Sequence, residues 1–337
     1  MTVRAAIIGL GSWGQTLVTS AQSHVEDLKF TSGYTRTPSK VGAFCAQHGI
    51  ELAERYEAVL ADDKVDAVVL TTPHSQHEEQ IKAAARAGKH IFSEKPVALH
   101  RRGVEAAIEA VDKAGLILAV GFNRRFHPSM RELVRRVKRQ DLGAIGSVIA
   151  ELTATTGLYR SLDSWRVDAT EEPAGALAGI GVHLIDAMID AVGRIRKVYC
   201  VVTQRAVGYG PDTTSLMLEF ENGVTGFAYC SAAAARNFRF AVYGSQGFAE
   251  VLGATMDRFR FVPAVQGRAS HLAQPPDGET IETPHVNTTT EELRHFARAI
   301  ESGTPYPVPL EDVMHGACVF DAAVESARIG QPVLVAT

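Results

Sequence analysis

The chain has 337 residues, of which 46% are apolar and 21% are charged, and its formal net charge is −4. This length suffices for two domains with their own cores, and the composition is typical of a folded soluble protein. The negative net charge argues against sequence-independent binding of nucleic acid. No stretch reaches the roughly 18 consecutive apolar residues that a membrane span needs.

Up to about residue 122, short β-branched runs alternate with stretches of helical periodicity. The expected strands are VRAAII, KFTSGY, DAVVLTT, HIFSE and LILAVG. Two of the expected helices are Ser75–Ala87 and Arg101–Ala114, and Gly88 and Gly115 follow them where a left-handed C-cap belongs. Such alternation indicates βαβ units and a parallel sheet. We therefore predict an α/β protein with an N-terminal Rossmann dinucleotide-binding domain over residues 1–122.

Residues 123–337 show a different pattern. Helical stretches at Pro128–Gln140 and Ala176–Val192 precede consecutive strands, KVYCVVTQ, SLMLEF, GVTGFAYC and RFAVYG, and turn signals such as ENG and GSQG separate several of them. Two more helices are expected near Thr288–Ser302 and Leu310–Ile329. This predicts a C-terminal α/β domain with a largely antiparallel open sheet and helices on one face. The other face of such a sheet needs cover, so we expect a homodimer or homotetramer formed through it.

The cysteines and the N-terminus bear on the compartment. Cys45, Cys200, Cys230 and Cys318 lie far apart and include no C-x-x-C pair, which indicates reduced, mostly buried residues. The first predicted strand begins at once and leaves no room for a signal peptide. Both observations favour a cytoplasmic location.

The stretch AAIIGLGSWGQ contains the pattern Gly9-x-Gly11-x-x-Gly14 between a predicted strand and a predicted helix. In this context Gly9 permits a tight turn, Gly11 lets a pyrophosphate approach the backbone, and Gly14 lets helix and strand pack closely. The helix N-terminus, which begins with Ser12 and Trp13, offers N–H groups and a positive dipole end to phosphates. A dinucleotide is the expected ligand.

The end of the second predicted strand discriminates between the two nicotinamide dinucleotides. An Asp or Glu about 20 residues after the glycine motif normally binds the NAD ribose hydroxyls. Here the segment is SGYTRTPSK, with Thr35 and Arg36 and no carboxylate. Arg36 can bind a 2′-phosphate with two parallel hydrogen bonds, so NADP is favoured over NAD. The alternative is that Arg36 only stacks on the adenine, which suits either cofactor.

Further landmarks are EKP (Glu94–Pro96), TTPHSQH (Thr71–His77), GFNRRFHP (Gly121–Pro128), SWRVD (Ser164–Asp168) and GALAGIGVHLID (Gly175–Asp186). Together with the glycine motif, this ensemble resembles the Gfo/Idh/MocA family of nicotinamide-dependent oxidoreductases over nearly the whole chain. The resemblance implies a cofactor lying between the two domains, with its nicotinamide facing a polyol-type substrate.

The resemblance also implies roles for individual residues. Lys95 would lie beside the substrate hydroxyl and the nicotinamide, and His183 would act as general acid and base. The cofactor site would comprise Gly9, Gly11, Ser12, Trp13, Gly14, Thr35, Arg36, Thr72, Pro73, His74, His77, Glu94, Lys95 and Asn123, with Trp165 and Arg166 reaching across from the second domain. The substrate contacts would be Lys95, Arg125, Tyr159 and His183. The bond between Lys95 and Pro96 is often cis in such proteins.

These residue types suit the chemistry independently of the resemblance. Hydride transfer from an alcohol carbon needs a group that accepts the hydroxyl proton and later returns it, and histidine does both near neutral pH. A neighbouring ammonium group such as that of Lys95 stabilises a developing alkoxide. His74 and His77 invite a metal-site interpretation, but no carboxylate or cysteine set completes one, and we expect no metal.

One position departs from the family pattern. Family dehydrogenases commonly carry an aspartate four residues before the histidine, and this chain has Gly179 there. Asp186 shares a helix face with His183, but family members usually carry an Asp there too, and we expect it to be structural. Without an aspartate at position 179, the chain lacks a possible second proton carrier or acceptor of a substrate hydroxyl. Arginines and tyrosines near the expected substrate cleft pair with local acids such as Glu171 and Glu172, or else bind a carboxylated substrate.

The sequence therefore predicts an NADP- or NAD-dependent oxidoreductase that interconverts a secondary alcohol and a carbonyl on a sugar, cyclitol or related polyol, carboxylated or neutral. Two alternatives stay open. Gly179 is compatible with a non-catalytic nucleotide-binding sensor or regulator, and a tightly bound nicotinamide could serve transient oxidation and elimination. The exact substrate and the direction of the reaction are not specified by the sequence.

Overall fold

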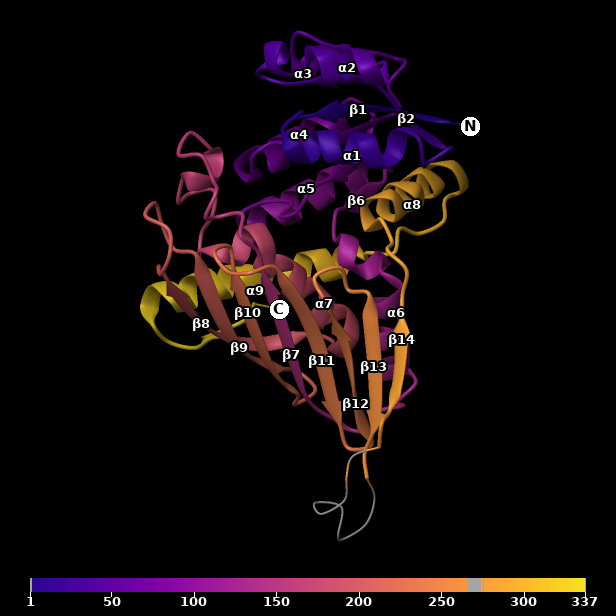
Figure 1. Cartoon of the computed structure of the whole chain (residues 1–337). Coiled ribbons are helices and arrows are strands. Elements are labelled where there is room, and N and C mark those ends of the chain that lie inside the picture. The colour runs from indigo at the N-terminus through magenta and orange to yellow at the C-terminus, as the bar shows by residue number, and fades with distance from the viewer. Residues whose placement is uncertain (1, 266–273, 275, 337) are drawn as a thin grey trace. The chain divides into compact units, whose positions relative to one another are not determined.

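The computed structural model describes residues 2–265, 274 and 276–336. The chain divides into two compact units, the first formed by Met1–Asn123 and Asn287–Met314 and the second by Arg124–Val286 and His315–Thr337. Each unit has its own sheet (Figure 1).

The first unit contains a six-stranded parallel sheet in the order β3-β2-β1-β4-β5-β6. Its strands are β1 (Val3–Ile8), β2 (Leu28–Tyr34), β3 (Glu51–Leu52), β4 (Ala67–Leu70), β5 (His90–Ser93) and β6 (Leu118–Val120). Because the order reverses between β1 and β4, a crevice opens at the carboxyl ends of these two strands, and ligands of doubly wound sheets bind there. The sheet thus confirms the predicted Rossmann fold.

The helices of the first unit are α1 (Ser12–Gln22), α2 (Gly42–His48), α3 (Tyr56–Leu60), α4 (His74–Arg86), α5 (Arg101–Ala114) and α8 (Thr288–Ser302). α5 shows why these segments fold as they do. Its buried residues Gly103, Val104, Ala107 and Val111 share one face, as the helical period requires. His100 caps its start by accepting the Gly103 N–H, and Gly115 ends it in the left-handed conformation.

Helix α8 comes from the far end of the chain and packs against α1. Leu293, Phe296 and Ala297 are fully buried in the core that also contains Leu17 and Val18. Burial of a large apolar side chain contributes about 1.5–3 kcal/mol, so this face holds α8 to the first unit.

The second unit contains a nine-stranded sheet in the order β14-β13-β12-β11-β7-β10-β9-β8-β15. The strands are β7 (Ile145–Thr153), β8 (Ile195–Thr203), β9 (Thr213–Phe220), β10 (Thr225–Ser231), β11 (Asn237–Gly244), β12 (Gly247–Leu252), β13 (Arg258–Pro263), β14 (Glu279–Glu282) and β15 (Val333–Leu334). The pairs are antiparallel except for β7 and β10, which are parallel. The prediction of a largely antiparallel sheet is confirmed.

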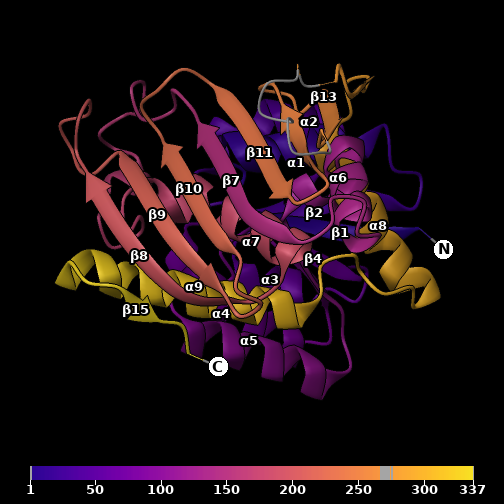
Figure 2. The ribbon, with the colours of Figure 1, turned by 90° about the horizontal axis from the view of Figure 1, so that it is seen from below.

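The two faces of this sheet differ in character. α6 (Pro128–Lys138) contacts β12 and β13, and α7 (Val182–Val192) contacts β7. α9 (Leu310–Ile329) meets β8, where Ser326 Oγ accepts the Cys200 N–H at 2.9 Å. The side chains that alternate to the other face include Tyr199, Met217 and Phe227, which are 37%, 47% and 45% exposed. Figure 2 shows β8, β9, β10, β7 and β11 side by side.

The predicted elements differ from the observed ones in a few places. The strands β3, β7, β12, β13, β14 and β15 were not predicted, and the helix expected at Ala176–Val192 is a π-helical turn at Leu177–Gly181 followed by α7. All four cysteines are buried, as predicted, and burial raises the pKa of the Cys200 and Cys230 thiols to about 12. Within the described residues, no helix has both the length and the apolarity that crossing a bilayer demands.

Candidate functional site

The glycine loop joins β1 to α1 at the point where the strand order reverses. Gly9 has φ +97°, and a Cβ there would lie 2.9 Å from the carbonyl carbon of Thr71 after β4. A Cβ on Gly14 would lie 2.1 Å from the Gly9 carbonyl oxygen, so only glycine lets helix and loop approach this closely. By contrast, a Cβ on Gly11 would meet nothing within 4 Å.

The start of α1 is suited to an anion. Gly11 is its N-cap, no described side chain caps the helix, and no acidic residue lies in its first turn. The N–H groups of this turn and the helix dipole therefore face the open space at Gly11 with positive partial charge. This is the arrangement that binds a pyrophosphate in dinucleotide-binding folds.

The loop after β2 is basic. Thr35 is half-buried and Arg36 is exposed, and Lys40 is the next charged residue of the loop. Because the loop has no carboxylate, nothing in it repels a phosphate at this edge of the sheet.

His77 joins the loops that follow β4 and β5. It is fully buried in α4, its Nδ1 lies 2.7 Å from the Pro96 carbonyl oxygen, and its Nε2 lies 2.9 Å from the Thr72 carbonyl oxygen. His74, at the start of the same helix, is 2% exposed, and its ring centroid is 6.0 Å from that of His77. In the described part of the chain no three His, Cys, Asp or Glu residues are grouped so as to hold a metal.

Glu94 and Lys95 follow β5 and are 6% and 9% exposed. Trp13 donates its indole N–H to Glu94 Oε1 at 2.6 Å, which ties the first turn of α1 to this loop. A Cβ on Gly121 would lie 2.9 Å from the same oxygen, so that glycine makes room for the carboxylate. The bond between Lys95 and Pro96 is cis, as the resemblance implied.

In the second unit, His183 lies in the first turn of α7 and is 7% exposed. One turn later, Asp186 accepts two hydrogen bonds from Arg125 Nε at 3.0 Å and one from Arg125 Nη2 at 2.7 Å. Both side chains are buried. Asp186 is thus held in a buried ion pair with Arg125, in keeping with the structural role expected for it.

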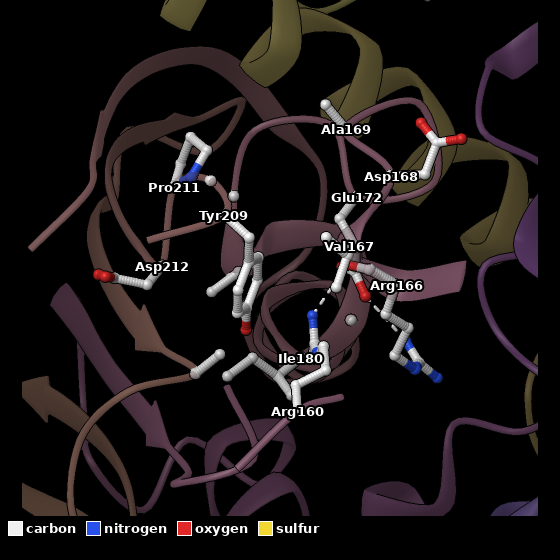
Figure 3. Close-up of a pocket in the computed structure, with 15 residues that line it drawn as sticks. Arg160, Arg166, Val167, Asp168, Ala169, Glu172, Ile180, Tyr209, Pro211 and Asp212 are labelled. Atoms are coloured by element: carbon white, nitrogen blue, oxygen red, sulfur yellow. Dashed lines mark hydrogen bonds and ion pairs between the residues drawn. The ribbon is translucent and has the colours of Figure 1, made fainter. Parts of the chain in front are cut away.

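A hollow in the second unit forms where the segment 160–180 meets the loop 209–212. Its lining includes Arg160, Arg166, Glu172, Gly179 and Tyr209 (Figure 3). Arg166 Nη1 bonds Glu172 Oε1 at 2.8 Å, and Arg160 Nη1 donates to the Arg166 carbonyl oxygen at 3.0 Å. The predicted pairing of arginines with local acids is therefore confirmed for Arg166 and Glu172.

The remaining predicted site residues also divide between the units. Pro73 is the N-cap of α4, and Asn123 begins the 3-10 turn Asn123–Phe126 after β6. Trp165 is half-buried and stacks on the Arg166 guanidinium with its ring centroid 4.2 Å from Cζ, whereas Tyr159 is 84% exposed. No residue pattern pointed directly to Tyr209 or to the contact between Glu172 and Gly179. The only available hint was the glycine in place of the family aspartate.

Comparison with known proteins decides the family. Residues 3–122 match the model of an oxidoreductase family with an NAD-binding Rossmann fold, and residues 130–250 match the GFO/IDH/MocA C-terminal domain. The chain belongs to the GFO/IDH/MocA oxidoreductase family. The resemblance inferred from the motifs is thereby confirmed.

Several relatives span the whole chain. Inositol 2-dehydrogenase of Rhizobium meliloti (strain 1021) is 26% identical over 344 residues, covering 100% of both chains. D-xylose 1-dehydrogenase (NADP(+)) 2 of Haloferax volcanii is 29% identical over 303 residues, covering 89% of this chain and 90% of its own. Levoglucosan dehydrogenase, solved in complex with NADH and levoglucosan, has a TM-score of 0.88 at 23% identity and covers 100% of both chains, which shows the same fold.

The residues of this family member fit a nicotinamide dinucleotide. The left-handed turn at Gly9 and the open space at Gly11 form a cradle that any Cβ would narrow, at the start of a helix without a side-chain cap. The relative from Haloferax volcanii is named for NADP(+), and levoglucosan dehydrogenase was solved with NADH. The family match therefore establishes a nicotinamide nucleotide without choosing between NAD and NADP.

Proposed function

We propose that this protein is an NADP(H)-preferring oxidoreductase that interconverts a secondary alcohol and a carbonyl on a sugar, cyclitol or related polyol, neutral or carboxylated. The observation that carries the proposal is the glycine cradle at the switch point between β1 and β4, in a chain that belongs to this oxidoreductase family. The relatives named for inositol, xylose and levoglucosan support a polyol-type substrate.

The residues of the chain would divide the chemistry between them. A bound nicotinamide nucleotide supplies the hydride acceptor or donor. Lys95 would orient the substrate oxygen and stabilise negative charge on it, and His183 would take the hydroxyl proton and return it in the reverse direction. Both side chains are largely buried, and electrostatic interactions are stronger in such surroundings than in bulk water.

The other predicted site residues are assigned their contacts from their positions in the fold. We propose that Ser12, Trp13, Thr72, Pro73, His74, His77, Glu94 and Asn123 border the nucleotide, because they lie at the carboxyl ends of β1, β4, β5 and β6. Arg36 would take the 2′-phosphate. Tyr159, Trp165 and Arg166 would also contact the ligand. Arg125 would act on the substrate through α7, since its guanidinium binds Asp186.

The test is a turnover assay at 340 nm with NAD⁺ and NADP⁺ against myo-inositol, scyllo-inositol, D-xylose, D-glucose, levoglucosan and their acids. We expect turnover of at least one polyol, with NADP⁺ preferred. Lys95→Ala and His183→Ala should each lower kcat by about 10²–10⁴-fold while nucleotide affinity stays within about threefold. If Lys95→Ala turns over substrate at the wild-type rate, the role proposed for Lys95 is wrong.

Two other outcomes point to the competing functions. Tight nucleotide binding without any absorbance change across the panel would favour the sensor, for which Gly179 is the motivating residue. Product formation without net change in the nicotinamide would favour transient oxidation followed by elimination. Both outcomes would contradict the dehydrogenase proposal.

We also propose that the protein is a homo-oligomer joined through the open face of the second-unit sheet. Across neighbouring strands, Tyr199 pairs with Met217, Met217 with Phe227, and Phe227 with Ile149. At a strand spacing of about 4.8 Å these side chains form one continuous apolar row, and such rows mark association surfaces.

A further inference from the structure

Glu172 fills the space beside Gly179. A Cβ built on Gly179 would lie 3.0 Å from Glu172 Oε2 and 3.2 Å from Oε1, which is tighter than nine in ten real Cβ contacts. The absence of a side chain at Gly179 therefore lets this carboxylate lie directly against the π-helical turn at Leu177–Gly181. The carboxylate that family dehydrogenases commonly carry at this position has a counterpart here that comes from a different point of the sequence.

The location places this carboxylate near the proposed proton carrier. Gly179 precedes His183 by four residues, and residues at this spacing lie on neighbouring turns of one helix face. A group that rests on Gly179 is therefore one turn from His183. Hydroxyls on adjacent carbons of a polyol lie closer together than one helical turn of about 5.4 Å, so each of them can reach a separate acceptor when the two acceptors lie one turn apart.

The surroundings of Glu172 make it an oriented acceptor. Its side chain is only 11% exposed, and Arg166 bonds one of its oxygens at 2.8 Å, which holds the carboxylate in one place. A carboxylate has acceptor capacity for about four hydrogen bonds, so the pairing with Arg166 leaves room for a ligand donor. Figure 3 shows Glu172 and Arg166 joined in this way in the lining of the hollow.

The size of the hollow limits what enters it. The space that water-sized molecules can occupy is about 40 Å³. One water needs at least about 10–15 Å³, so the hollow has room for roughly three polar groups of a ligand and not for a whole sugar ring. Hydroxyl groups fit both the volume and the acceptor.

We propose that Glu172 accepts a hydrogen bond from a substrate hydroxyl next to the one that His183 deprotonates, and so selects substrates with vicinal hydroxyl groups. Arg166 is the positioning residue that holds the carboxylate. This inference rests on the proposed dehydrogenase function and adds the residue that reads the neighbouring hydroxyl. Because the acceptor is a largely buried carboxylate that a guanidinium holds in place, loss of the bond should cost about 10–100-fold in kcat/KM.

The experiment compares wild type with Glu172→Ala, Glu172→Gln and the relocated variant Glu172→Ala/Gly179→Asp. Each is assayed with NADP⁺ and a polyol that the wild type oxidises, chosen from myo-inositol, D-xylose and levoglucosan, and with monodeoxy analogues of that polyol. The matched control is Asp163→Ala, an exposed acid of the neighbouring segment that does not line the hollow. Melting temperature and NADP⁺ affinity are recorded for every variant.

We expect Glu172→Ala and Glu172→Gln to lower kcat/KM on the full polyol by about 10–100-fold, mainly through KM, with NADP⁺ affinity and the control unchanged. On the analogue that lacks the recognised hydroxyl, wild type and variants should differ by less than about threefold. The relocated aspartate should recover at least part of the loss. If Glu172 has only a structural role, its substitution should lower kcat/KM equally on the polyol and on all of its analogues, and Glu172→Ala/Gly179→Asp should recover none of the loss. That result would overturn the inference.

Failure of the inference and failure of the proposed function give different patterns. Wild-type turnover that survives Glu172→Ala unchanged overturns the inference alone. If wild type oxidises nothing, the function fails, and calorimetric binding of the same three polyols to the NADP⁺-loaded protein decides the inference separately. Weaker binding in Glu172→Ala supports it, and equal or absent binding overturns it.

Discussion

Arg125 and Asp186, 61 positions apart in the sequence, form an ion pair in which Nη2 and Oδ1 are 2.7 Å apart and both side chains are at most 5% exposed. Removing one partner of such a pair leaves a buried charge without compensation, which costs about 3–5 kcal/mol. We predict that Arg125→Ala lowers the free energy of unfolding by this amount in urea titrations. Arg125→Met/Asp186→Leu should stay much closer to wild type, because it removes both charges.

The matched control for this prediction is an exposed pair. Arg135 Nη2 and Glu132 Oε1 are 2.6 Å apart, but Arg135 is 45% exposed. Arg135→Ala should change the free energy of unfolding by no more than about 1 kcal/mol. If Arg125→Ala and Arg135→Ala lower the free energy of unfolding equally, the buried pair contributes no more to stability than the exposed one.

Gly11 and Gly14 should respond differently to the same substitution. Gly11→Ala meets no atom within 4 Å and has φ −66°, so stability should stay within about 1 kcal/mol. The added methyl occupies the space proposed for the pyrophosphate, and the nucleotide Kd should rise about 10–100-fold. Gly14→Ala would place Cβ 2.1 Å from the Gly9 carbonyl oxygen and should destabilise the fold by about 1–3 kcal/mol.

Urea denaturation and tryptophan-fluorescence titration with NADP⁺ measure the two effects. Gly42→Ala serves as control, because a Cβ there also meets nothing within 4 Å and the position lies at the start of α2, outside the glycine loop. If Gly11→Ala binds the nucleotide with wild-type affinity, the pyrophosphate does not bind beside Gly11.

Arg36→Ala should weaken NADP⁺ and spare NAD⁺. If the exposed guanidinium binds the 2′-phosphate, its loss should raise the Kd of NADP⁺ about 10–100-fold and leave that of NAD⁺ within about threefold. Lys29→Ala is the control, since Lys29 is an exposed cation at the opposite end of the same strand, β2. Equal weakening of both nucleotides would indicate adenine stacking as the role of Arg36.

Charges on the open sheet face should dissociate the oligomer. Met217→Lys and Phe227→Glu each place an ion within the apolar row, and burying an unpaired ion in an interface is costly. Light scattering after size-exclusion chromatography should show a smaller species for both variants, and the wild-type species for Ile329→Lys, an exposed apolar residue at the end of α9. A monomeric wild type would contradict the proposed assembly.

The carboxylate of Asp212 makes the free energy of unfolding depend on pH in the acidic range. Burial alone would raise the pKa of Asp212, but the N–H groups of Ala206, Arg205 and Val207 and the hydroxyl of Thr213 together hold that pKa below its usual range. The stabilisation is therefore fully present above the unfolded value of about 3.9 and is lost as the pH falls through the lowered folded value.

Asp212→Asn should accordingly lower the free energy of unfolding by about 2 kcal/mol at neutral pH, and the difference from wild type should shrink below about pH 4. Urea titrations at several pH values measure it. Asp63→Asn, at an exposed site, is the control for the substitution itself and should change the free energy of unfolding at neutral pH by no more than about 0.5 kcal/mol. A difference that stays constant down to pH 3 would assign the loss to packing and not to the charge.

Local requirements explain what could be predicted from the residues alone. The glycine motif was recognisable because Gly9 needs a left-handed turn and Gly14 needs the absence of a Cβ, and both constraints act within a few residues. The bounds of α5, α8 and α9 match the prediction for the same reason, since periodicity and capping are local. Lys95 and His183 stood out only through the family motifs around them, and their roles remain proposals.

Contacts between distant segments were decided only by the tertiary structure. The return of α8 to the core of the first unit, the parallel pairing of β7 with β10, and the commitment of Arg125 to Asp186 each join residues far apart in the chain. The position of Glu172 against Gly179 is of the same kind. Composition and periodicity specify which face of an element is buried, but not which partner covers it, because the partner depends on where the folded backbone brings the other segments.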